Sequence, residues 1–135
     1  LFRSEQGIGD QILYASMFNE ARARVGRMIL AVEDRLQPLF ARAFPDCEVT
    51  TVADALRQRR FDLQLPMGSL GRHLRSSAAD FPRRRKAFLI ADGQRSAALR
   101  KTIAPGRKRI CGISWRSSNA ELGEHKSMAL FALQL

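Results

Sequence analysis

Two polar stretches contain residue types from which a catalytic or ligand-binding site could be built. One is residues 5–10 (EQGIGD) and the other is residues 115–119 (WRSSN). Each follows a short apolar segment that we predict to be a β-strand. In open α/β sheets, ligands bind beyond the carboxyl ends of the strands. Both stretches are therefore candidate ligand sites.

Asp10 is the residue of the first stretch with the clearest chemical potential, and two interpretations of it are open. A carboxylate at the start of a helix is a common N-cap, where it accepts hydrogen bonds from backbone N–H groups. At the mouth of a cleft, the same carboxylate would be a general base that takes a proton from a hydroxyl group. The two roles compete in part, because N–H donors stabilise the charged carboxylate and so weaken it as a base.

Gly7 and Gly9 precede Asp10 in a predicted tight turn into a helix. Glycine lets the backbone approach a ligand closely, and a helix N-terminus favours negative charge. The spacing Gly-x-Gly-Asp lacks the third glycine of the dinucleotide fingerprint. Glu33, which lies near the distance expected for a ribose-binding acid, therefore does not indicate dinucleotide binding by itself.

Strand-like and helix-like segments alternate along the chain, which is the order expected of βαβ units. Apolar residues recur every four positions from Leu13 to Val25, as on one face of a helix, and Asp34 is expected to cap the next helix. The predicted fold is α/β and Rossmann-like, in three α/β/α layers with a mostly parallel sheet. We predict strands at residues 1–4, 28–32, 48–52, 61–65, 87–91 and 109–114, and helices at 10–25, 34–44, 53–59, 68–75 and 94–103, the last with Ala97, Ala98 and Ile103 facing inward.

The cysteines and histidines are too widely separated to form a metal-binding motif. Cys47 and Cys111 are the two cysteines, and His73 and His125 are the two histidines. We expect no metal site, no cofactor and no disulfide, with both cysteines reduced and buried as small apolar side chains.

The charge of the chain is strongly positive, with 23 Lys and Arg against 13 Asp and Glu, a net charge of +10. Such an excess attracts nucleic acid, anionic lipid headgroups or phosphorylated sugars and nucleotides. A basic nucleic-acid-binding module is one alternative, prompted by Arg57, Arg59, Arg60 and the basic run 83–86. The aromatic residues lie in apolar faces and not between the basic ones, which disfavours a base-stacking platform. A non-catalytic protein-interaction domain, or a contact of the basic run with an anionic membrane surface, are further alternatives.

The length of 135 residues suits one domain with a real core. The chain starts at Leu1 inside an apolar dipeptide and stops within an apolar, helix-like pattern, so both ends look truncated. No apolar run approaches the roughly 18 to 20 residues of a membrane span, and the start lacks the layout of a signal peptide. We therefore expect a cytoplasmic protein, with a contact to the inner face of the membrane as an open alternative.

Three segments resemble one family of enzymes. Residues 4–15 (SEQGIGDQILYA) resemble the opening motif of the heptosyltransferase-like glycosyltransferases, also called glycosyltransferase family nine, in the branch that carries tetratricopeptide repeats. Residues 61–70 (FDLQLPMGSL) are similar to that branch's mid-lobe segment, and residues 112–117 (GISWRS) to its last first-lobe strand and the following loop. The three segments occur in the family's order and span most of the chain.

The resemblance implies a two-lobed GT-B enzyme that transfers a sugar from a nucleotide-sugar donor without a metal. Residues 1–122 would be the N-terminal, acceptor-side lobe, and residues 123–135 would begin the connection to a C-terminal donor-binding lobe. The acceptor would be a glycan, a lipid-linked molecule or a protein. Because most of the leaving-group site would belong to the other lobe, we expect little or no turnover by this chain alone.

The resemblance also implies roles for individual residues. Asp10 matches the family's catalytic base, and Gly7 and Gly9 match the turn that presents it, with Gln11 expected beside them at the substrate. Lysine suits a diphosphate as a point charge. The substrate contacts implied in the second stretch, some of them to donor phosphates, are Trp115, Arg116, Ser117, Ser118 and Lys126.

Two features of the second stretch depart from the family. Ser117 stands where this branch often has glycine, and Glu121 and Glu124 precede Lys126 with charges that oppose a phosphate. Trp115 and Lys126 also have simpler interpretations, as a core or rim aromatic residue and as a solvated surface lysine.

Overall fold

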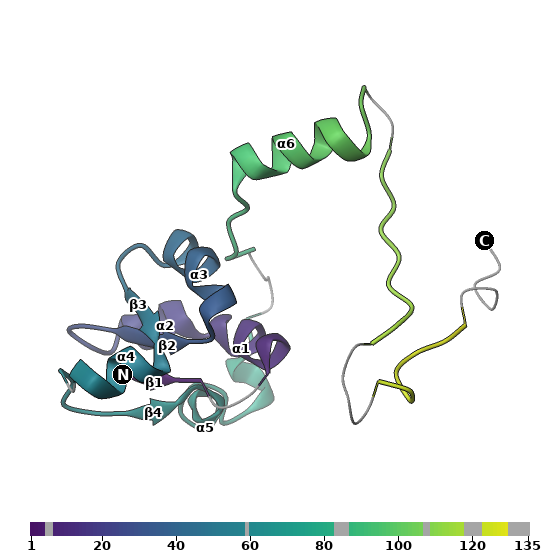
Figure 1. Cartoon of the computed structure of the whole chain (residues 1–135). Coiled ribbons are helices and arrows are strands. Elements are labelled where there is room, and N and C mark those ends of the chain that lie inside the picture. Colours follow the sequence, from purple (N-terminus) through teal and green to yellow (C-terminus); the bar gives the residue numbers. More distant parts are fainter. Residues whose placement is uncertain (5–6, 59, 83–86, 107–108, 118–122, 130–135) are drawn as a thin grey trace. The chain divides into compact units, whose positions relative to one another are not determined.

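The computed structural model describes residues 1–4, 7–58, 60–82, 87–106, 109–117 and 123–129. The chain divides into two units, Leu1–Asp92 and Gly93–Leu135 (Figure 1). The first unit contains the β-sheet and a hydrophobic core. The prediction that residues 1–122 form one lobe and 123–135 a connection stays a prediction.

The first unit is built on a four-stranded parallel sheet, which confirms the predicted Rossmann-like α/β fold. The strands are β1 (Phe2–Arg3), β2 (Ile29–Val32), β3 (Glu48–Thr51) and β4 (Leu65–Pro66), in the order β3-β2-β1-β4. Phe2 is paired with Leu30 on one side and with Leu65 on the other. The strand predicted at 61–65 is thus reduced to its last residue and the following proline.

Helices connect the strands, and most lie where the sequence predicts them. The segment 10–25 forms two helices and not one, because the backbone after Ala15 forms hydrogen bonds between residues three apart instead of four. Ser16 donates its N–H and its Oγ–H to the carbonyl of Leu13, at 3.2 and 2.7 Å, and such local bonds compete with a continuous helix. The helices of this unit are α1 (Ile8–Ala15), α2 (Phe18–Arg22), η1 (Asp34–Leu36), α3 (Gln37–Ala43), α4 (Val52–Gln58), η2 (Met67–Ser69), α5 (Leu70–Leu74) and η3 (Ala78–Asp80).

The predicted cap at Asp34 is wrong by one residue. Glu33 is the N-cap of η1, and its carboxylate accepts the backbone N–H of Arg35 at 3.1 Å. Glutamate reaches this N–H through its longer side chain and also pairs with the Arg35 Nε at 2.6 Å.

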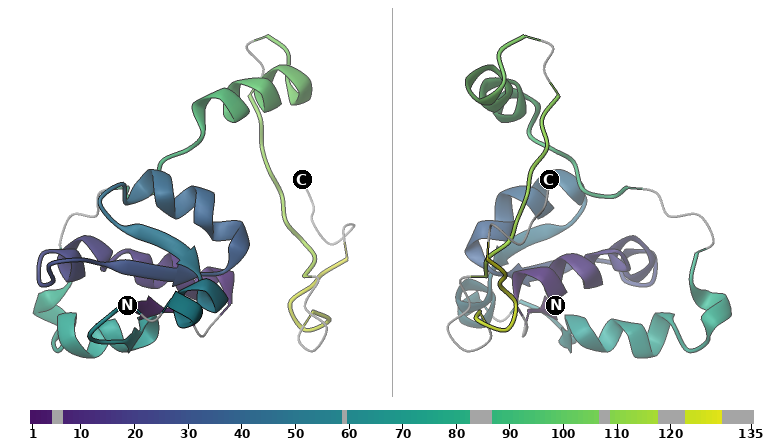
Figure 2. Two further views of the ribbon diagram at one scale, coloured as in Figure 1. Left: turned by 60° about the vertical axis from the view of Figure 1, so that its left-hand side comes forward. Right: turned by 90° about the vertical axis from the view of Figure 1, so that its right-hand side faces the viewer.

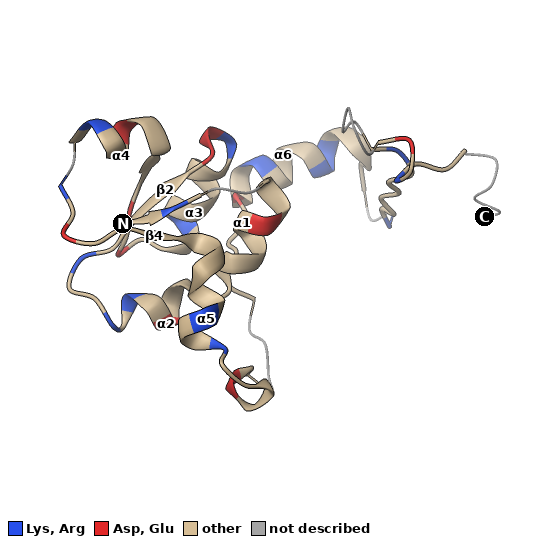
Figure 3. Ribbon diagram, turned by 90° about the horizontal axis from the view of Figure 1, so that it is seen from below, with Lys and Arg blue, Asp and Glu red and all other residues tan. Residues whose placement is uncertain are grey.

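Both faces of the sheet are covered. In β2, Leu30 and Val32 belong to the main hydrophobic cluster, whereas Ile29 and Ala31 are buried outside it. Successive side chains of a strand point to opposite faces, so the second pair faces the other side of the sheet. Figure 3 shows α4 on one side of the strands and α2 and α5 on the other, and Figure 2 gives two further views.

Aromatic rings fill the main cluster. Phe18, Phe40 and Phe44 meet edge to face, with ring centroids 5.3 to 5.8 Å apart. Phe88 stacks on Phe44 at 6.1 Å. Residues 87–91, predicted as an edge strand, form no strand, and their apolar side chains Phe88 and Leu89 pack against the core.

The second unit differs from its prediction. Its helix α6 (Gly93–Ile103) forms as expected, but none of its residues is buried, so the predicted inward face of Ala97, Ala98 and Ile103 is wrong. The segment 109–114 is exposed and is not a strand, because the described part of this unit contains no strand to pair with it. Cys111 is exposed for the same reason. Figure 3 shows the basic residues of α6, which carries no acidic one.

Cys47 lies in the first unit and is half buried against the core. Burial raises the pKa of its thiol, so the neutral form is favoured, as expected of a packing residue. None of the described helices has the length and apolar content that crossing a membrane requires.

An ion pair ties the chain after α5 to α2. The Arg75 guanidinium donates from Nη1 and Nη2 to the two carboxylate oxygens of Glu20, at 2.6 and 2.5 Å. The side chain of Arg75 is only 7% exposed, while that of Glu20 is 45% exposed. The hydrogen bond from Arg75 lowers the pKa of Glu20.

We predict that this pair makes stability depend on pH. A carboxylate whose pKa is lowered in the folded state stabilises the fold fully at any pH above its unfolded-state pKa of about 4.3. This stabilisation is lost as the pH falls through the folded-state pKa. Glu20→Gln should lower the free energy of unfolding at neutral pH by a few tenths to about 1 kcal/mol, since one partner is exposed. In strong acid the variant and the wild type should be equally stable. Urea unfolding at both pH values measures this, and an undiminished difference in acid would contradict it.

Candidate functional site

Asp10 lies in the first turn of α1, directly after β1. The helix begins at Ile8 with Gly7 as its N-cap, so Asp10 is the third helical residue, and of its two interpretations the N-cap is wrong. Its side chain is exposed, and no hydrogen bond between described residues engages its carboxylate. A negative charge in the first turn is favoured by the helix dipole. The carboxylate is therefore held at the carboxyl edge of the sheet and is open to an incoming hydroxyl.

Gly7 and Gly9 leave space at this helix start. A Cβ at Gly7 would lie 3.7 Å from Oδ2 of Asp10, which is ordinary contact, and a Cβ at Gly9 would meet nothing within 4 Å. Gly9 belongs to the helix and not to the turn before it. The protein's own packing therefore does not require glycine at position 9, and the open space is available to a ligand.

Gln11 points inward from the same turn. It is 3% exposed, and its Oε1 accepts the backbone N–H of Glu33 at 3.1 Å. This bond joins the start of α1 to the carboxyl end of β2. Gln11 thereby fixes the helix turn from which Asp10 projects, while its predicted contact with substrate stays a prediction.

We predict that Gln11→Leu lowers the free energy of unfolding by about 1 to 3 kcal/mol, because it leaves the Glu33 N–H without its acceptor. Leu13→Ala, at a 61% exposed position of the same helix, should cost less than about 1 kcal/mol. Chemical denaturation of both variants measures the difference. Equal losses would show that the Gln11 bond contributes nothing specific.

A cavity of about 550 Å³ with both polar and apolar walls lies at the carboxyl ends of β1, β2 and β3. This is where the parallel sheet predicts a ligand site. Asp10 itself does not line the cavity, although its neighbour Gln11 does. Two carboxylates and no described Lys or Arg line it, so it suits hydroxyl groups better than phosphates. The lining residues are Ser4, Gln11, Val32, Glu33, Asp34, Thr51, Val52 and Ala53.

Thr51 closes one side of this cavity and is held by α4. Its Oγ1 donates to the Asp54 carboxylate at 2.8 Å and accepts the Asp54 N–H at 2.9 Å. The first of these bonds lowers the pKa of Asp54, whose side chain is 39% exposed. The arrangement fixes the end of β3 relative to the start of α4.

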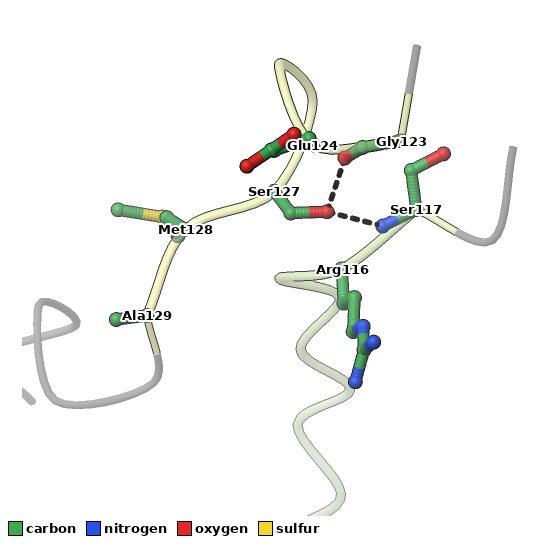
Figure 4. Close-up of a pocket in the computed structure, with 7 residues that line it drawn as sticks. All are labelled: Arg116, Ser117, Gly123, Glu124, Ser127, Met128 and Ala129. Atoms are coloured by element: carbon green, nitrogen blue, oxygen red, sulfur yellow. Dashed lines mark hydrogen bonds between the residues drawn. The ribbon is translucent and has the colours of Figure 1, made fainter. Parts of the chain in front are cut away.

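The second group of predicted residues lies in the second unit. The Ser117 N–H donates to Oγ of Ser127 at 2.9 Å, and that hydroxyl donates to the Gly123 carbonyl at 2.5 Å (Figure 4). The Trp115 carbonyl accepts the Met128 N–H at 2.9 Å. These bonds bring residues 115–117 beside residues 123–128. The cavity between them, of about 860 Å³, is lined by Arg116, Ser117, Gly123, Glu124, Ser127, Met128 and Ala129.

The charges of this second cavity are mixed. Arg116 and Glu124 both line it, and Figure 4 shows the Arg116 side chain pointing away from Ser127. Lys126 is exposed and does not line it, and Ser118 lies outside the described residues. Among the described residues, no group of three or more His, Cys, Asp or Glu side chains could hold a metal ion.

Several lining residues could not be recognised in the sequence. Asp34 and Thr51 reach the first cavity because β2 and β3 end beside β1, and Ser127 reaches the second because its hydroxyl bonds two separate segments. For Asp34 and Thr51, the available signal in the sequence was their position at the end of a predicted strand. Nothing in the local sequence distinguishes Ser127 from other polar loop residues.

The first unit is thus a Rossmann-like α/β unit with an open candidate site at the carboxyl edge of its sheet. No family model matches the sequence, and no solved structure matches it. The chain is similar to Protein FlbA of Caulobacter vibrioides, with 38% identity over 136 residues, which cover 87% of this chain and 22% of FlbA. The chain therefore spans about a fifth of the length of this relative. Because 87% of the chain exceeds the length of Leu1–Asp92, the similarity includes residues of both units.

Proposed function

We propose that this chain is the acceptor-side lobe of a glycosyltransferase, with Asp10 as the base that deprotonates the acceptor hydroxyl. The observation that carries the proposal is the exposed Asp10 carboxylate on the first turn of α1, at the carboxyl edge of a parallel sheet. A base must reach the hydroxyl it deprotonates, and an open carboxylate at the usual ligand-binding edge meets this requirement. The resemblance of residues 4–15 to the heptosyltransferase-like enzymes supports the same role.

The acceptor is a glycan or a glycan-bearing molecule in this proposal. Sugar hydroxyls donate hydrogen bonds to carboxylates, and they both donate to and accept from serine, threonine and amide groups. Groups of these kinds line the neighbouring cavity. The reaction is a direct displacement at the anomeric carbon of the donor. The acceptor oxygen forms the new bond, the nucleoside diphosphate leaves with the bonding electron pair, and Asp10 takes the proton.

The donor contacts belong mainly to a part of the protein beyond this chain. Arg116 and Ser117 are candidates for a contribution from this side, since both line the second cavity and offer donors to phosphate oxygens. Cationic groups there would stabilise the departing diphosphate. Glu124 in the same lining opposes a phosphate, so we assign these residues a minor share of the donor site.

The proposal is tested by measuring release of nucleoside diphosphate from a panel of nucleotide sugars. The full-length protein should turn over at least one donor when acceptor is supplied, and the isolated chain should not. Absence of turnover by the full-length protein with every donor would favour a non-catalytic interaction domain. Turnover by the isolated chain would contradict the assignment of the leaving-group site to another lobe.

A further inference from the structure

The hydroxyl of Ser127 joins two segments of the second unit. It accepts the N–H of Ser117, 10 positions away, at 2.9 Å and donates to the Gly123 carbonyl at 2.5 Å (Figure 4). A serine hydroxyl has a single proton to donate, and the bond to Gly123 uses it. Ser127 therefore serves as a bridge within the chain, and its proton is engaged before any ligand arrives.

Residues 123–128 form a closed turn that presents this hydroxyl. Two backbone bonds between residues three apart, 3.2 and 3.3 Å long, close the turn. At its end, the Met128 N–H donates to the Trp115 carbonyl at 2.9 Å. The turn thus holds its own shape, and the Ser127 hydroxyl and the Met128 N–H attach it to residues 115–117.

Hydrogen bonds, and not apolar packing, hold these two segments together. No residue of α6 is buried, and the side chains of Ile110, Ile113 and Trp115 are 39 to 46% exposed. Both bonds of the Ser127 hydroxyl are partly buried, so the groups that it engages would lose their partners out of full contact with water. A polar group left without a partner in this way costs free energy, and the chain rearranges to avoid it.

The bond from Ser117 fixes the peptide group that follows Arg116. The Ser117 N–H belongs to the peptide between these two residues, so holding it holds the backbone from which the Arg116 side chain projects. Both residues line the cavity of about 860 Å³. Figure 4 shows the Arg116 side chain pointing away from Ser127, so Ser127 acts on the backbone of Arg116 and not on its guanidinium.

We propose that Ser127 is a positioning residue for the nucleoside diphosphate part of the donor. Its hydroxyl holds Arg116 in the place from which the guanidinium contacts the diphosphate. A site ordered in advance binds more tightly than one that the ligand must order, because ordering costs entropy. The inference rests on the proposed function, which gives Arg116 and Ser117 a share of the donor phosphates.

Steady-state kinetics of Ser127→Ala in the full-length protein test this role. The KM for the nucleotide sugar should rise about tenfold, the effect of losing two neutral hydrogen bonds. The kcat should stay within about threefold, since a loss of uniform binding raises KM alone. The KM for the acceptor should not change, because the acceptor groups belong to the first unit. Ser127→Thr keeps the hydroxyl and should restore the donor KM.

Ser96→Ala is the matched control, since Ser96 is an exposed serine of α6 that does not line this cavity. It should leave both KM values as in the wild type. If Ser127→Ala raises the donor and acceptor KM values equally, or if threonine does not restore the donor KM, Ser127 has a general structural role and the proposal is wrong.

A double variant tests whether Ser127 acts through Arg116. Arg116→Gln should itself raise the donor KM, because a cation is lost beside the diphosphate. Adding Ser127→Ala to it should raise the KM by clearly less than in the wild-type background, since residues that act through one another are not additive. The same increase in both backgrounds would contradict the proposal.

Direct binding separates this inference from the proposed function. Calorimetric titration of the full-length protein with uridine, guanosine and adenosine diphosphates requires no turnover. We expect at least one of them to bind, about tenfold more weakly to Ser127→Ala and normally to Ser127→Thr. Turnover with the same donor KM in the wild type and in Ser127→Ala would refute this inference alone. A wild type that neither turns over nor binds a nucleoside diphosphate would refute the proposed function, and this inference with it.

Discussion

Replacing Asp10 by Asn is expected to lower sugar transfer by the full-length protein about 10²- to 10⁴-fold, the usual contribution of a general base. Asparagine keeps the size of the side chain but cannot accept the proton of the acceptor hydroxyl. The exposed position means that the fold should survive, with a loss of helix-dipole stabilisation of about 0.3 to 1 kcal/mol. The effect should fall on kcat more than on KM, because the proton moves during the chemical step. Steady-state rates of nucleoside diphosphate release measure both.

Asp46→Asn is the matched control for this variant. Asp46 is also an exposed aspartate of the first unit, and it lines none of the cavities described above. Its replacement should leave the rate within about twofold of the wild type, as for a surface residue away from the reaction. Asp10→Glu should recover part of the rate, since a carboxylate is restored at a shifted position. If Asp10→Asn is as active as the wild type, Asp10 is not the base.

Phe18→Ala should lower the free energy of unfolding by about 3 to 5 kcal/mol, the largest stability effect expected in this chain. Phe18 is fully buried, and its ring contacts both Phe40 and Phe44 edge to face. Removing it loses apolar burial and two aromatic contacts and leaves a cavity between α2 and α3. Because a domain has only about 5 to 15 kcal/mol of stability, the variant should be close to unfolding.

Urea unfolding measures this loss as a shift of the midpoint by roughly 2 M. Leu56→Ala, at an exposed position of α4, is the control and should change stability by less than about 1 kcal/mol. A loss no larger than that of the control would mean that the aromatic cluster does not hold α2 to α3.

The parallel α/β order could be read from the sequence because it depends on local patterns. The apolar run of β2 is buried on both faces, and such a continuous run is typical of a parallel strand between two helical layers. The polar stretch after β1 was recognised as a site for the same reason, since strand ends define the ligand edge of such a sheet. Asp10 and its exposure at that edge follow from this order.

Long-range packing decided what the sequence could not. The apolar pattern of 109–114 predicted a buried strand, but burial needs a neighbouring strand, and a pattern does not say whether one is present. Gln11 was predicted to contact the substrate, yet its side chain is buried and its Oε1 accepts the backbone N–H of Glu33, 22 positions away. The sequence by itself determined the alternation of elements and the placement of Asp10 beside β1, through contacts between near neighbours. Only the tertiary structure decided which side chains line each cavity, because segments far apart in the chain had to meet first.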